Sequence, residues 1–463
     1  MEAIAKSDKV FKYLLIGIYS IIFITILHNL RTPYLWFDEA GQFFISKGLN
    51  HNSIPYSHPN GLLSVIENNK HYNLDPGGFS VLLHFWSYIS NYHIWLRLLP
   101  FIFFIGVVCS FIFLSYKWTN NLNIALLIGV IPILTPVVLA MGFEVRAYSM
   151  ESLGTMLTIV ALEHFKKDVT NKYLLVWSCI FSFFMTSRYS EIVVVIIVSL
   201  YIVFLILNKT SGTLKQKLMS VIIYLLPLFV TFIYIYFFAL IYQNKSLAPV
   251  AYLPYLKTDI SLLLIPKNML FLCLIVFLFI VYLFKNRIPF IKKYETLLFL
   301  TVIVNVSFIV LSFLNMYPWL PFSNRSISVL LLTLTCLSAI LGELLLVLFK
   351  STDILKYYLI AYILLFTLYL KKDNLLIRFY NNNVYVELER DSVPYNKIFV
   401  NSTESPSIKY MYEYGKFKSK KKNIYPKCFT FEKWHESIVN RSRLNLKDYD
   451  LFISPMKNVD DWQ

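Results

Sequence analysis

Apolar runs of about twenty residues recur along most of the chain, separated by short polar stretches. An α-helix needs roughly 20 mainly apolar residues to cross a bilayer. We therefore expect an all-α polytopic membrane protein with about eleven transmembrane helices. They are expected near residues 12–30, 95–116, 122–141, 147–165, 173–187, 190–208, 219–242, 268–285, 295–315, 326–349 and 354–370.

Two regions interrupt this pattern. Residues 31–94 form a long polar loop after the first span, and within it 78–90 ("GFSVLLHFWSYIS") is apolar but short, which predicts a juxtamembrane helix lying at the interface. Residues 371–463 are rich in Lys, Asn, Glu and Tyr, so the chain divides into a membrane domain, 1–370, and a soluble domain, 371–463.

The soluble segment is expected to be a small α/β domain. Its stretches "KIFVNST" and "YDLFISP" are typical of strands, whereas "SPSIKYMYEYG" and "FEKWHESIVNRSR" are typical of helices.

Composition supports a membrane protein. The chain is 57% hydrophobic and only 15% charged, with a mean hydropathy of +0.58, whereas soluble proteins carry about 25% charged residues. The net charge of +16 is explained by Lys and Arg in cytoplasmic loops rather than by nucleic-acid binding. The five cysteines form no CxxC pair, so neither a disulfide framework nor a zinc site is indicated.

Loop charges suggest an orientation. With a cytoplasmic amino terminus, the inner loops "YKWTNN", "EHFKKDVTNK", "NKTSGTLKQK", "KNRIPFIKKY" and "KSTDILK" all contain Lys or Arg. The basic start of the chain has no cleavage signal, so the first span is expected to be retained. Loop 31–94, which follows the first span, then lies outside, and an odd number of spans places the soluble domain outside as well. The plasma membrane of a bacterium is the expected location.

Candidate chemistry begins at "YLWFDEAGQFF", where Asp38 and Glu39 lie between aromatic residues just after the first span. Further ionisable residues gather at the outer ends of spans, and charges at membrane depth mark functional sites by default. These residues are His71, Asp75, Arg97, Glu144, Arg146, Arg188, Glu191 and Arg325.

Structural roles are the alternative for most of these residues. Asp38 and Glu39 could be a solvated pair capping the next helix, and Glu144 and Arg146 could close their turn as a salt bridge. Arg97 could extend to lipid headgroups, Arg188 could be structural, and His71 and Asp75 could simply form turns.

Together the residues suit one chemistry. Several arginines at one interface could hold a phosphate through bidentate hydrogen bonds, and a nearby carboxylate could act as a general base. A sugar carried on a polyprenyl phosphate fits, because its tail stays in lipid while its phosphate lies at the interface.

The motifs "WFDEA", "DPGGFSVLLHFWSYIS…WLRLLPFIF" and "FEVRAYSM" resemble the GT-C superfamily of membrane glycosyltransferases, over roughly residues 10–210. The nearest patterns are those of the protein mannosyltransferase and lipid A aminoarabinose transferase families. The resemblance implies a polyprenyl-phosphate sugar donor, Asp38 as catalytic base and Glu39 as the neighbouring acid.

The same resemblance assigns further residues. It matches a Glu-x-Arg-x-Tyr turn to Glu144, Arg146 and Tyr148, with the arginine near donor phosphate. Arg325 matches a late-span arginine without the usual tyrosine after it, and "LDPGG" stands where relatives carry His-Pro-Pro, next to His71 and Asp75.

The expected reaction is an inverting displacement at the anomeric carbon by an acceptor, which is a glycan, a lipid or a protein. Arg146, Arg325 and Arg188 would stabilise the leaving phosphate. Glu144, Tyr148, His71 and Asp75 would contact substrate. No cofactor is required, although Asp38 and Glu39 could hold a divalent cation.

Three other protein classes compete with this interpretation. They are a transporter or flippase of lipid-linked sugars, a glycan polymerase or ligase, and a non-catalytic membrane scaffold. A transporter is expected to show inverted repeats and midplane charges, which the sequence lacks, and a polymerase or ligase a large late outer loop.

Overall fold

The structure is a computed structural model that describes most of the first 348 residues and parts of the C-terminal segment. The described residues are 2–32, 35–49, 59–133, 135–167, 169–209, 213–246, 255–257, 259–286 and 289–348, with 398–401, 407, 410–411, 414, 429–432 and 451–453. The predicted span at 354–370 and most of the predicted soluble domain therefore lie outside the described residues.

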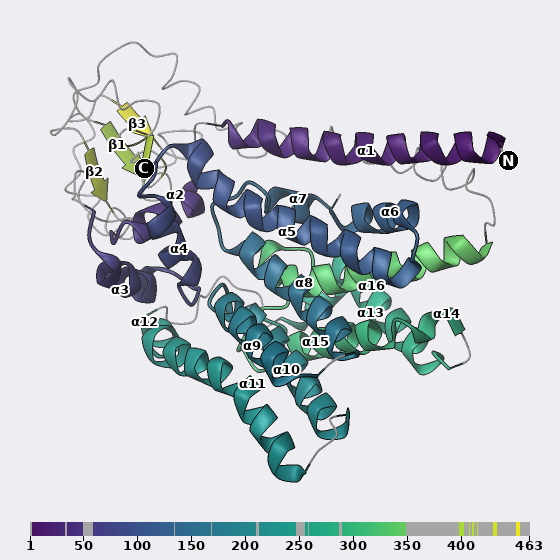
Figure 1. Cartoon of the computed structure of the whole chain (residues 1–463). Helices are drawn as coiled ribbons and strands as arrows, with labels where there is room; N and C mark the ends of the chain where they lie inside the picture. The colour runs from purple at the N-terminus through teal and green to yellow at the C-terminus, as the bar shows by residue number, and fades with distance from the viewer. Residues whose placement is uncertain are drawn as a thin grey trace.

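Helices dominate the described part of the chain (Figure 1). They are α1 (Glu2–Leu30), α2 (Phe37–Ser46), α3 (Leu62–Tyr72), α4 (Gly78–Trp86), α5 (His93–Thr119), α6 (Leu122–Ile133), α7 (Pro136–Ala140), α8 (Tyr148–Phe165), α9 (Asn171–Met185), α10 (Tyr189–Lys209), α11 (Leu214–Ile235), the π-helical turn η1 (Tyr236–Leu240), α12 (Ile241–Ser246), the 3-10 turn η2 (Ile260–Leu264), α13 (Pro266–Leu283), α14 (Pro289–Lys292), α15 (Glu295–Phe313), the 3-10 turn η3 (Asn324–Ser326) and α16 (Ile327–Leu348).

Six helical stretches in the described chain are long and apolar enough to cross a membrane, which supports a bilayer environment. They are His93–Thr119, Tyr189–Asn208, Leu214–Gln243, Pro266–Leu283, Glu295–Phe313 and Asn324–Leu344. Other predicted spans are helical but shorter, more polar or interrupted. The predicted span 122–141, for example, is divided between α6 and α7, with Pro136 starting the second helix.

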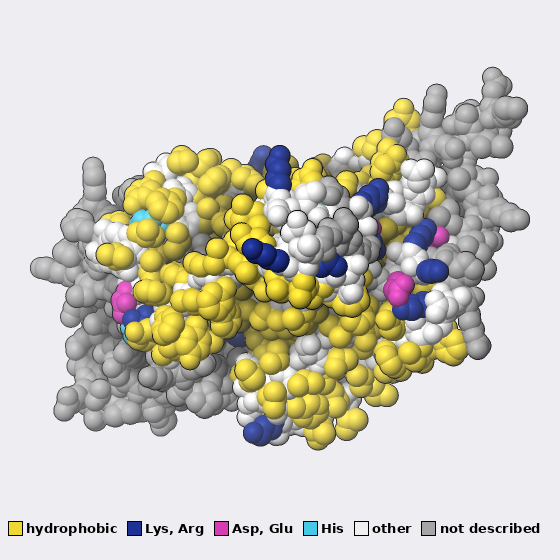
Figure 2. Space-filling view, turned by 60° about the horizontal axis from the view of Figure 1, so that its bottom comes forward, with side chains coloured by type: hydrophobic (Ala, Val, Ile, Leu, Met, Phe, Trp, Pro, Cys, Tyr) yellow, Lys and Arg dark blue, Asp and Glu magenta, His cyan; other side chains and the backbone are white. Residues whose placement is uncertain are grey.

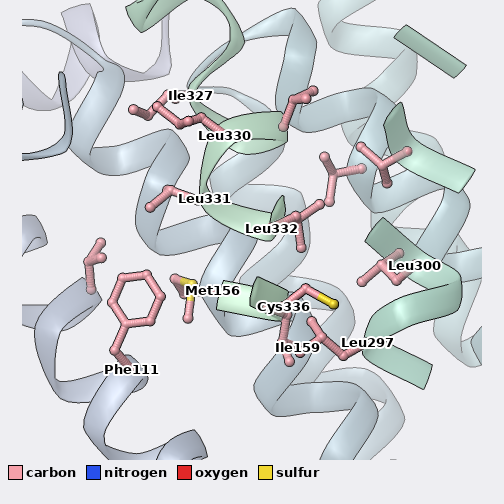
Figure 3. Packing of buried hydrophobic residues seen from close by; sticks show 14 of the residues in the cluster. Phe111, Met156, Ile159, Leu297, Leu300, Ile327, Leu330, Leu331, Leu332 and Cys336 are labelled. Carbon is pink, nitrogen blue, oxygen red and sulfur yellow. The ribbon is translucent and has the colours of Figure 1, made fainter. Parts of the chain in front are cut away.

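The bundle is built around α8, which packs against α5, α9, α10 and α16. Figure 3 shows Met156 and Ile159 of α8 among leucines of α15 and α16 and beside Phe111 of α5. Because α8 is covered by protein, it can carry Ser, Thr and Glu, and this explains why it is less apolar than its neighbours.

The outer helices show the opposite character. Only 17% of the most apolar window of Leu214–Gln243 is buried, and side chains such as Phe229 and Val230 are exposed. Figure 2 shows hydrophobic side chains over most of the described surface on the face it presents, with charged side chains in a few groups. A large exposed apolar surface of this kind marks contact with lipid.

Helices α2, α3 and α4 form a layer at one end of the bundle (Figure 1). The helix predicted at 78–90 is confirmed as α4, although it ends at Trp86. The rings of Trp86 and Trp95 stack at 4.5 Å, and each indole N–H donates to the other residue's carbonyl at 2.7 and 2.8 Å. This reciprocal contact fixes the angle between α4 and α5.

Three short strands lie near this layer (Figure 1): β1 (Ile398–Asn401), β2 (Phe429–Glu432) and β3 (Leu451–Ile453). They form a parallel sheet of order β2-β1-β3, in which Phe399 pairs with Thr430 and Phe452. β1 and β3 occupy the stretches predicted as strands. The helix predicted from Phe431 is wrong at its start, because pairing with β1 holds Phe431 and Glu432 in an extended conformation.

Two glycines dock the loop before α4 onto the α9–α10 turn. Gly77 has φ +103°, a region that favours glycine, and Gly78 N–H donates to the Thr186 carbonyl at 2.9 Å. A Cβ on Gly78 would lie 1.9 Å from Thr186 Oγ1 and 2.8 Å from the Thr186 carbonyl oxygen. The close approach therefore requires glycine at this position.

Gly78→Ala is expected to lower the free energy of unfolding by about 1–3 kcal/mol, the usual cost of overpacking. Thermal unfolding of the purified protein in detergent measures this. Gly41→Ala is the matched control, because nothing lies within 4 Å of its added Cβ and α2 would gain helix propensity. Equal midpoints for the two variants would contradict this docking of the loop.

Candidate active site

The start of α2 presents Asp38 and Glu39 in different surroundings. Glu39 reaches back to accept a hydrogen bond from Trp36 N–H at 3.1 Å, which caps the first turn of the helix. Adjacent helical residues project about 100° apart. Glu39 therefore turns inward and is 1% exposed, whereas Asp38 is half-buried.

The Glu39 carboxylate forms a buried ion pair with Arg97 of α5. Arg97 Nη2 donates to Glu39 Oε2 at 2.9 Å and Nε donates to Oε1 at 3.3 Å. Val145 N–H adds a hydrogen bond to Oε1 at 2.9 Å, and Arg97 Nη1 donates to the Thr32 carbonyl at 2.6 Å. Glu39 is therefore held in a buried ion pair, and Arg97 is 1% exposed rather than extended to lipid headgroups.

The turn before α8 brings Arg146 next to Asp38. Arg146 Nη1 donates to the Asp38 backbone carbonyl at 3.4 Å, and Arg146 Nε is buried without a hydrogen-bond partner among the described residues. Burial alone would lower the pKa of Arg146, but Tyr148, Asp38 and Asp75 raise it above its ordinary value. The guanidinium is therefore a fixed positive charge that faces both aspartates.

Tyr148 lies between two of the arginines. Its ring centroid is 4.5 Å from the guanidinium carbon of Arg188 and 5.7 Å from that of Arg146, both within cation–π range. Glu144 is buried in the same turn, where its backbone carbonyl accepts from Arg146 N–H at 2.7 Å. The Glu-x-Arg-x-Tyr sequence thus packs as one compact unit.

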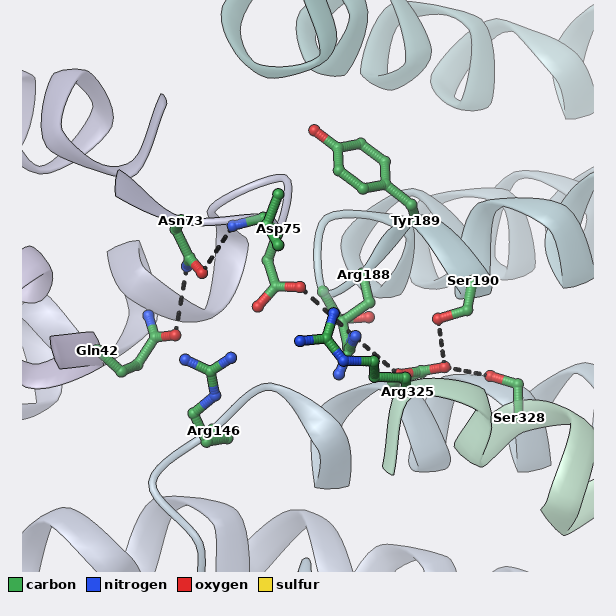
Figure 4. Close-up of polar contacts among 12 residues, drawn as sticks. Gln42, Asn73, Asp75, Arg146, Arg188, Tyr189, Ser190, Arg325 and Ser328 are labelled. Carbon is green, nitrogen blue, oxygen red and sulfur yellow. Dashed lines mark hydrogen bonds and ion pairs between the residues drawn. The ribbon is translucent and has the colours of Figure 1, made fainter. Parts of the chain in front are cut away.

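Asp75 enters the same group from the loop before α4. Its Oδ1 lies 3.4 Å from Arg188 Nε, and its side chain is largely buried. Its backbone carbonyl accepts hydrogen bonds from Asn69 Nδ2 at 2.8 Å and Gln243 Nε2 at 3.0 Å. Figure 4 shows Asp75 and Arg188 facing each other, so Asp75 is more than a turn former.

A network of amide side chains supports the Asp75 loop. Asn73 Nδ2 donates to Asn69 Oδ1 at 2.9 Å and to Gln42 Oε1 at 3.3 Å, and Asn73 Oδ1 accepts from Leu74 N–H at 2.9 Å. Buried polar groups persist where they are hydrogen-bonded, and a satisfied network of this kind rigidifies its surroundings.

Arg188 also contacts a carboxylate that the sequence did not single out. Glu151 of α8 places Oε2 at 3.3 Å from Arg188 Nε, while its Oε1 accepts from Ser190 at 2.6 Å and Ser328 at 2.5 Å (Figure 4). Burial alone would lower the pKa of Arg188, but acidic neighbours, Asp75 foremost, hold it well above its ordinary value. Arg188 Nη1 remains buried with no hydrogen-bond partner in the described structure.

Arg325 joins the group from η3, just before α16. Tyr317 O–H donates to its backbone carbonyl at 2.6 Å, and Tyr317 lies within electrostatic range of Arg188 and Glu151. Figure 4 includes Arg325 with this group, and within the described chain Arg325 forms no ion pair. Ser328 on the next helical turn anchors this end of α16 to Glu151.

Two candidates have other surroundings. His71 lies on the exposed side of α3, where its ring nitrogen is 2.9 Å from Glu67 Oε1. Its contact with Glu67 lies on α3 itself, away from the Asp75–Arg188 ion pair. Glu191 is fully buried on α10 and accepts from Thr155 at 2.7 Å.

The C-terminal segment contacts the helix that carries Asp38. Tyr410 is buried, its ring meets Phe43 edge-on at 5.2 Å, and its O–H donates to the Asn91 carbonyl at 2.9 Å. Tyr414 meets the same Phe43 ring at 5.0 Å. Residues from the far end of the chain therefore cover one side of α2.

The Asp38–Glu39 pair does not fit a divalent cation. Both Glu39 oxygens accept hydrogen bonds, from Arg97 and from the backbone N–H groups of Trp36 and Val145, so Glu39 is not available as a second ligand beside Asp38. No group of three or more metal-ligating side chains occurs among the described residues. We therefore derive no step through a metal ion.

The residues gathered here have a definite chemical capacity. Arg146 and Arg188 keep buried donors without hydrogen-bond partners among the described residues. Together with Arg325 they can bind an anion of the phosphate type. A half-buried carboxylate beside them can accept a proton. Searches against models of known protein families, curated proteins and solved structures gave no significant match, so the activity has to be inferred from these residues.

Sequence reasoning found some of these residues and missed others. Asp38, Asp75, Arg146, Tyr148 and Arg188 do converge. Glu151 could have been found, because an acidic residue inside an otherwise apolar span is costly unless it is used. The amides Gln42, Asn73 and Gln243 carry no comparable sequence signal.

Glu39→Gln is expected to lower the free energy of unfolding by about 3–5 kcal/mol, because it removes the carboxylate that pairs with the buried Arg97 guanidinium. Thermal unfolding in detergent tests this. Glu67→Gln, at a side chain 57% exposed, serves as control and is expected to change stability by less than about 0.5 kcal/mol.

The double variant Glu39→Gln/Arg97→Gln is expected to be more stable than Glu39→Gln alone, since neither charge is then left unpaired. If the stability lost in the double variant equals the sum of the losses in Glu39→Gln and Arg97→Gln, the ion pair is not the source of the stability.

Proposed function

We propose that this protein is an integral membrane glycosyltransferase that moves a sugar from a polyprenyl-phosphate donor to an acceptor. The observation that carries the proposal is the convergence of Asp38 with Arg146 at the α2 end of the bundle, with Arg188 alongside. Its resemblance to the GT-C superfamily points the same way.

The arginines would hold the donor phosphate. Arg146 Nε and Arg188 Nη1 are buried donors without partners among the described residues, and Arg325 supplies a further charge. Planar guanidinium groups bind phosphate oxygens through paired hydrogen bonds. Positive charge fixed in advance would stabilise the lipid phosphate as it departs.

Asp38 would act as the general base. An acceptor hydroxyl or amine attacks the anomeric carbon, the bond from that carbon to the phosphate oxygen breaks, and the acceptor proton passes to Asp38. Attack opposite the leaving phosphate inverts the configuration. Asp38 suits this role because it is half-buried, whereas Asp75 is largely buried against Arg188. Asp75, Tyr148 and Glu144 would shape the substrate pocket.

The proposed topology has eleven spans, a cytoplasmic amino terminus and an α/β soluble domain outside. The charges on α5 support this direction: Arg97 lies at its candidate-site end, whereas Lys117 lies about 30 Å further along the helix, paired with Glu163. Lys166 and Lys293 pair with Glu163 and Glu343. A lysine-rich opposite end fits a cytoplasmic face, as in the plasma membrane of a bacterium.

Two other functions predict different behaviour. A flippase or transporter of lipid-linked sugars would move the donor without cleaving it, and a scaffold would not consume it. Both would tolerate the loss of a base at Asp38.

Asp38→Asn is expected to reduce sugar transfer at least about a hundredfold, the usual contribution of a general base. The measurement supplies membranes with radiolabelled polyprenyl-phosphate sugars and follows label leaving the lipid fraction, at equal protein levels. Glu67→Gln, an exposed acid on α3, is the control and is expected to match the native protein. Unchanged transfer by Asp38→Asn would exclude the base assignment.

Arg146→Lys is expected to raise the donor concentration needed for half-maximal transfer by about tenfold, because lysine keeps the charge but loses the planar pair of donors. The same labelled-sugar assay, run over a range of donor concentrations, measures this. A change in the maximal rate alone would argue against donor binding by Arg146.

A further inference from the structure

The helical arm Leu214–Gln243 crosses the outside of the bundle and reaches the candidate site only at its end (Figure 1). Most of its side chains are exposed, as expected for a helix that faces lipid. Gln243 is an exception, because it is 4% exposed and lies in α12, next to α3.

Gln243 bridges two residues of the site. Its Oε1 accepts a hydrogen bond from Tyr189 O–H at 2.6 Å, and its Nε2 donates to the Asp75 backbone carbonyl at 3.0 Å. Tyr189 directly follows Arg188 in the chain. The Gln243 amide is therefore bonded to the backbone of Asp75 and to the residue next to Arg188, and Asp75 and Arg188 are the two partners of the ion pair. The hydrogen bonds of Gln243 thus go to the Tyr189 hydroxyl and to backbone carbonyls rather than to the charged groups themselves.

The π-helical turn Tyr236–Leu240 explains how a lipid-facing helix delivers this residue. A π-helical turn holds about one residue more than an α-helical turn, and each residue corresponds to about 100° of rotation. The turn therefore rotates α12 relative to the face set by α11. Turns of this type occur frequently at functional sites.

We propose that Gln243 is a positioning residue that holds the Asp75 loop against Arg188 and so sets the geometry of donor binding. This role rests on the proposed function, in which Arg188 binds the donor phosphate. Asn69 supports the same carbonyl from within the loop layer, whereas Gln243 ties that layer to the membrane arm.

Gln243→Leu is the first test, because leucine keeps the size of the side chain and removes its hydrogen bonds to Tyr189, to the Asp75 carbonyl and, at 3.4 Å, to the Asn69 carbonyl. We expect the donor concentration for half-maximal transfer to rise about tenfold, as for the loss of a buried hydrogen bond. Hydrogen–deuterium exchange in residues 73–78 is expected to become faster. Phe237→Leu, at an exposed position in the π-helical turn, is the matched control and should leave both readouts unchanged.

Tyr189→Phe provides a milder second variant, since it removes only the hydroxyl that donates to Gln243. We expect a smaller change in the same direction, and the double variant Gln243→Leu/Tyr189→Phe should be no worse than Gln243→Leu. Additive effects would mean that the two residues act separately, which would overturn the bridge.

The exchange measurement separates this proposal from the proposed function. If the native protein transfers no sugar, the glycosyltransferase proposal fails, and exchange in 73–78 alone decides whether Gln243 holds the loop. If exchange in 73–78 is the same in Gln243→Leu and the native protein, the positioning role is refuted even when transfer is slower.

Discussion

The buried ion pair between Glu39 and Arg97 is the constraint on which the α2 end of the bundle depends. It joins the end of α1, the start of α2, the first turn of α5 and the turn before α8 through hydrogen bonds to Thr32 and Val145. Neither charge can remain in an apolar interior without the other. Asp38 is adjacent to Glu39 in the chain, and Arg146 is adjacent to Val145. The ion pair and its hydrogen bonds therefore also fix the positions of Asp38 and Arg146.

The distribution of polarity follows from where water and lipid are excluded. α8 lies inside the bundle and can hold Glu151, because Ser190 and Ser328 satisfy its carboxylate and Arg188 neutralises it. α11 faces outward and is apolar on nearly every exposed position. Ionisable groups thus gather at one end of the protein interior, where several helices begin or end and backbone turns bring them together.

The C-terminal segment adds a contact that distance along the chain would not suggest. Tyr410 and Tyr414 pack on Phe43, on the helix that also carries Asp38. The Tyr410 hydroxyl bonds to Asn91 near the start of α5, so the contact combines apolar burial with a satisfied polar group. Phe43 lies one to two turns after Asp38 on α2, so these C-terminal residues pack against the helix that carries the proposed base.

Sequence alone determined the helical membrane character, because spans are set by the length of apolar runs and by the thickness of a bilayer. It also placed Asp38, Arg146 and Arg188 at helix ends, because a break in the apolar pattern can be read from the neighbouring residues alone. It could not separate Asp38 from Glu39, because only the rotation of α2 against α5 decides which carboxylate meets Arg97. Glu151, Gln243 and the strand at Phe431 likewise depended on partners distant in the chain. Those pairings belong to the tertiary structure, because local patterns specify which element forms but not which neighbour satisfies its polar groups.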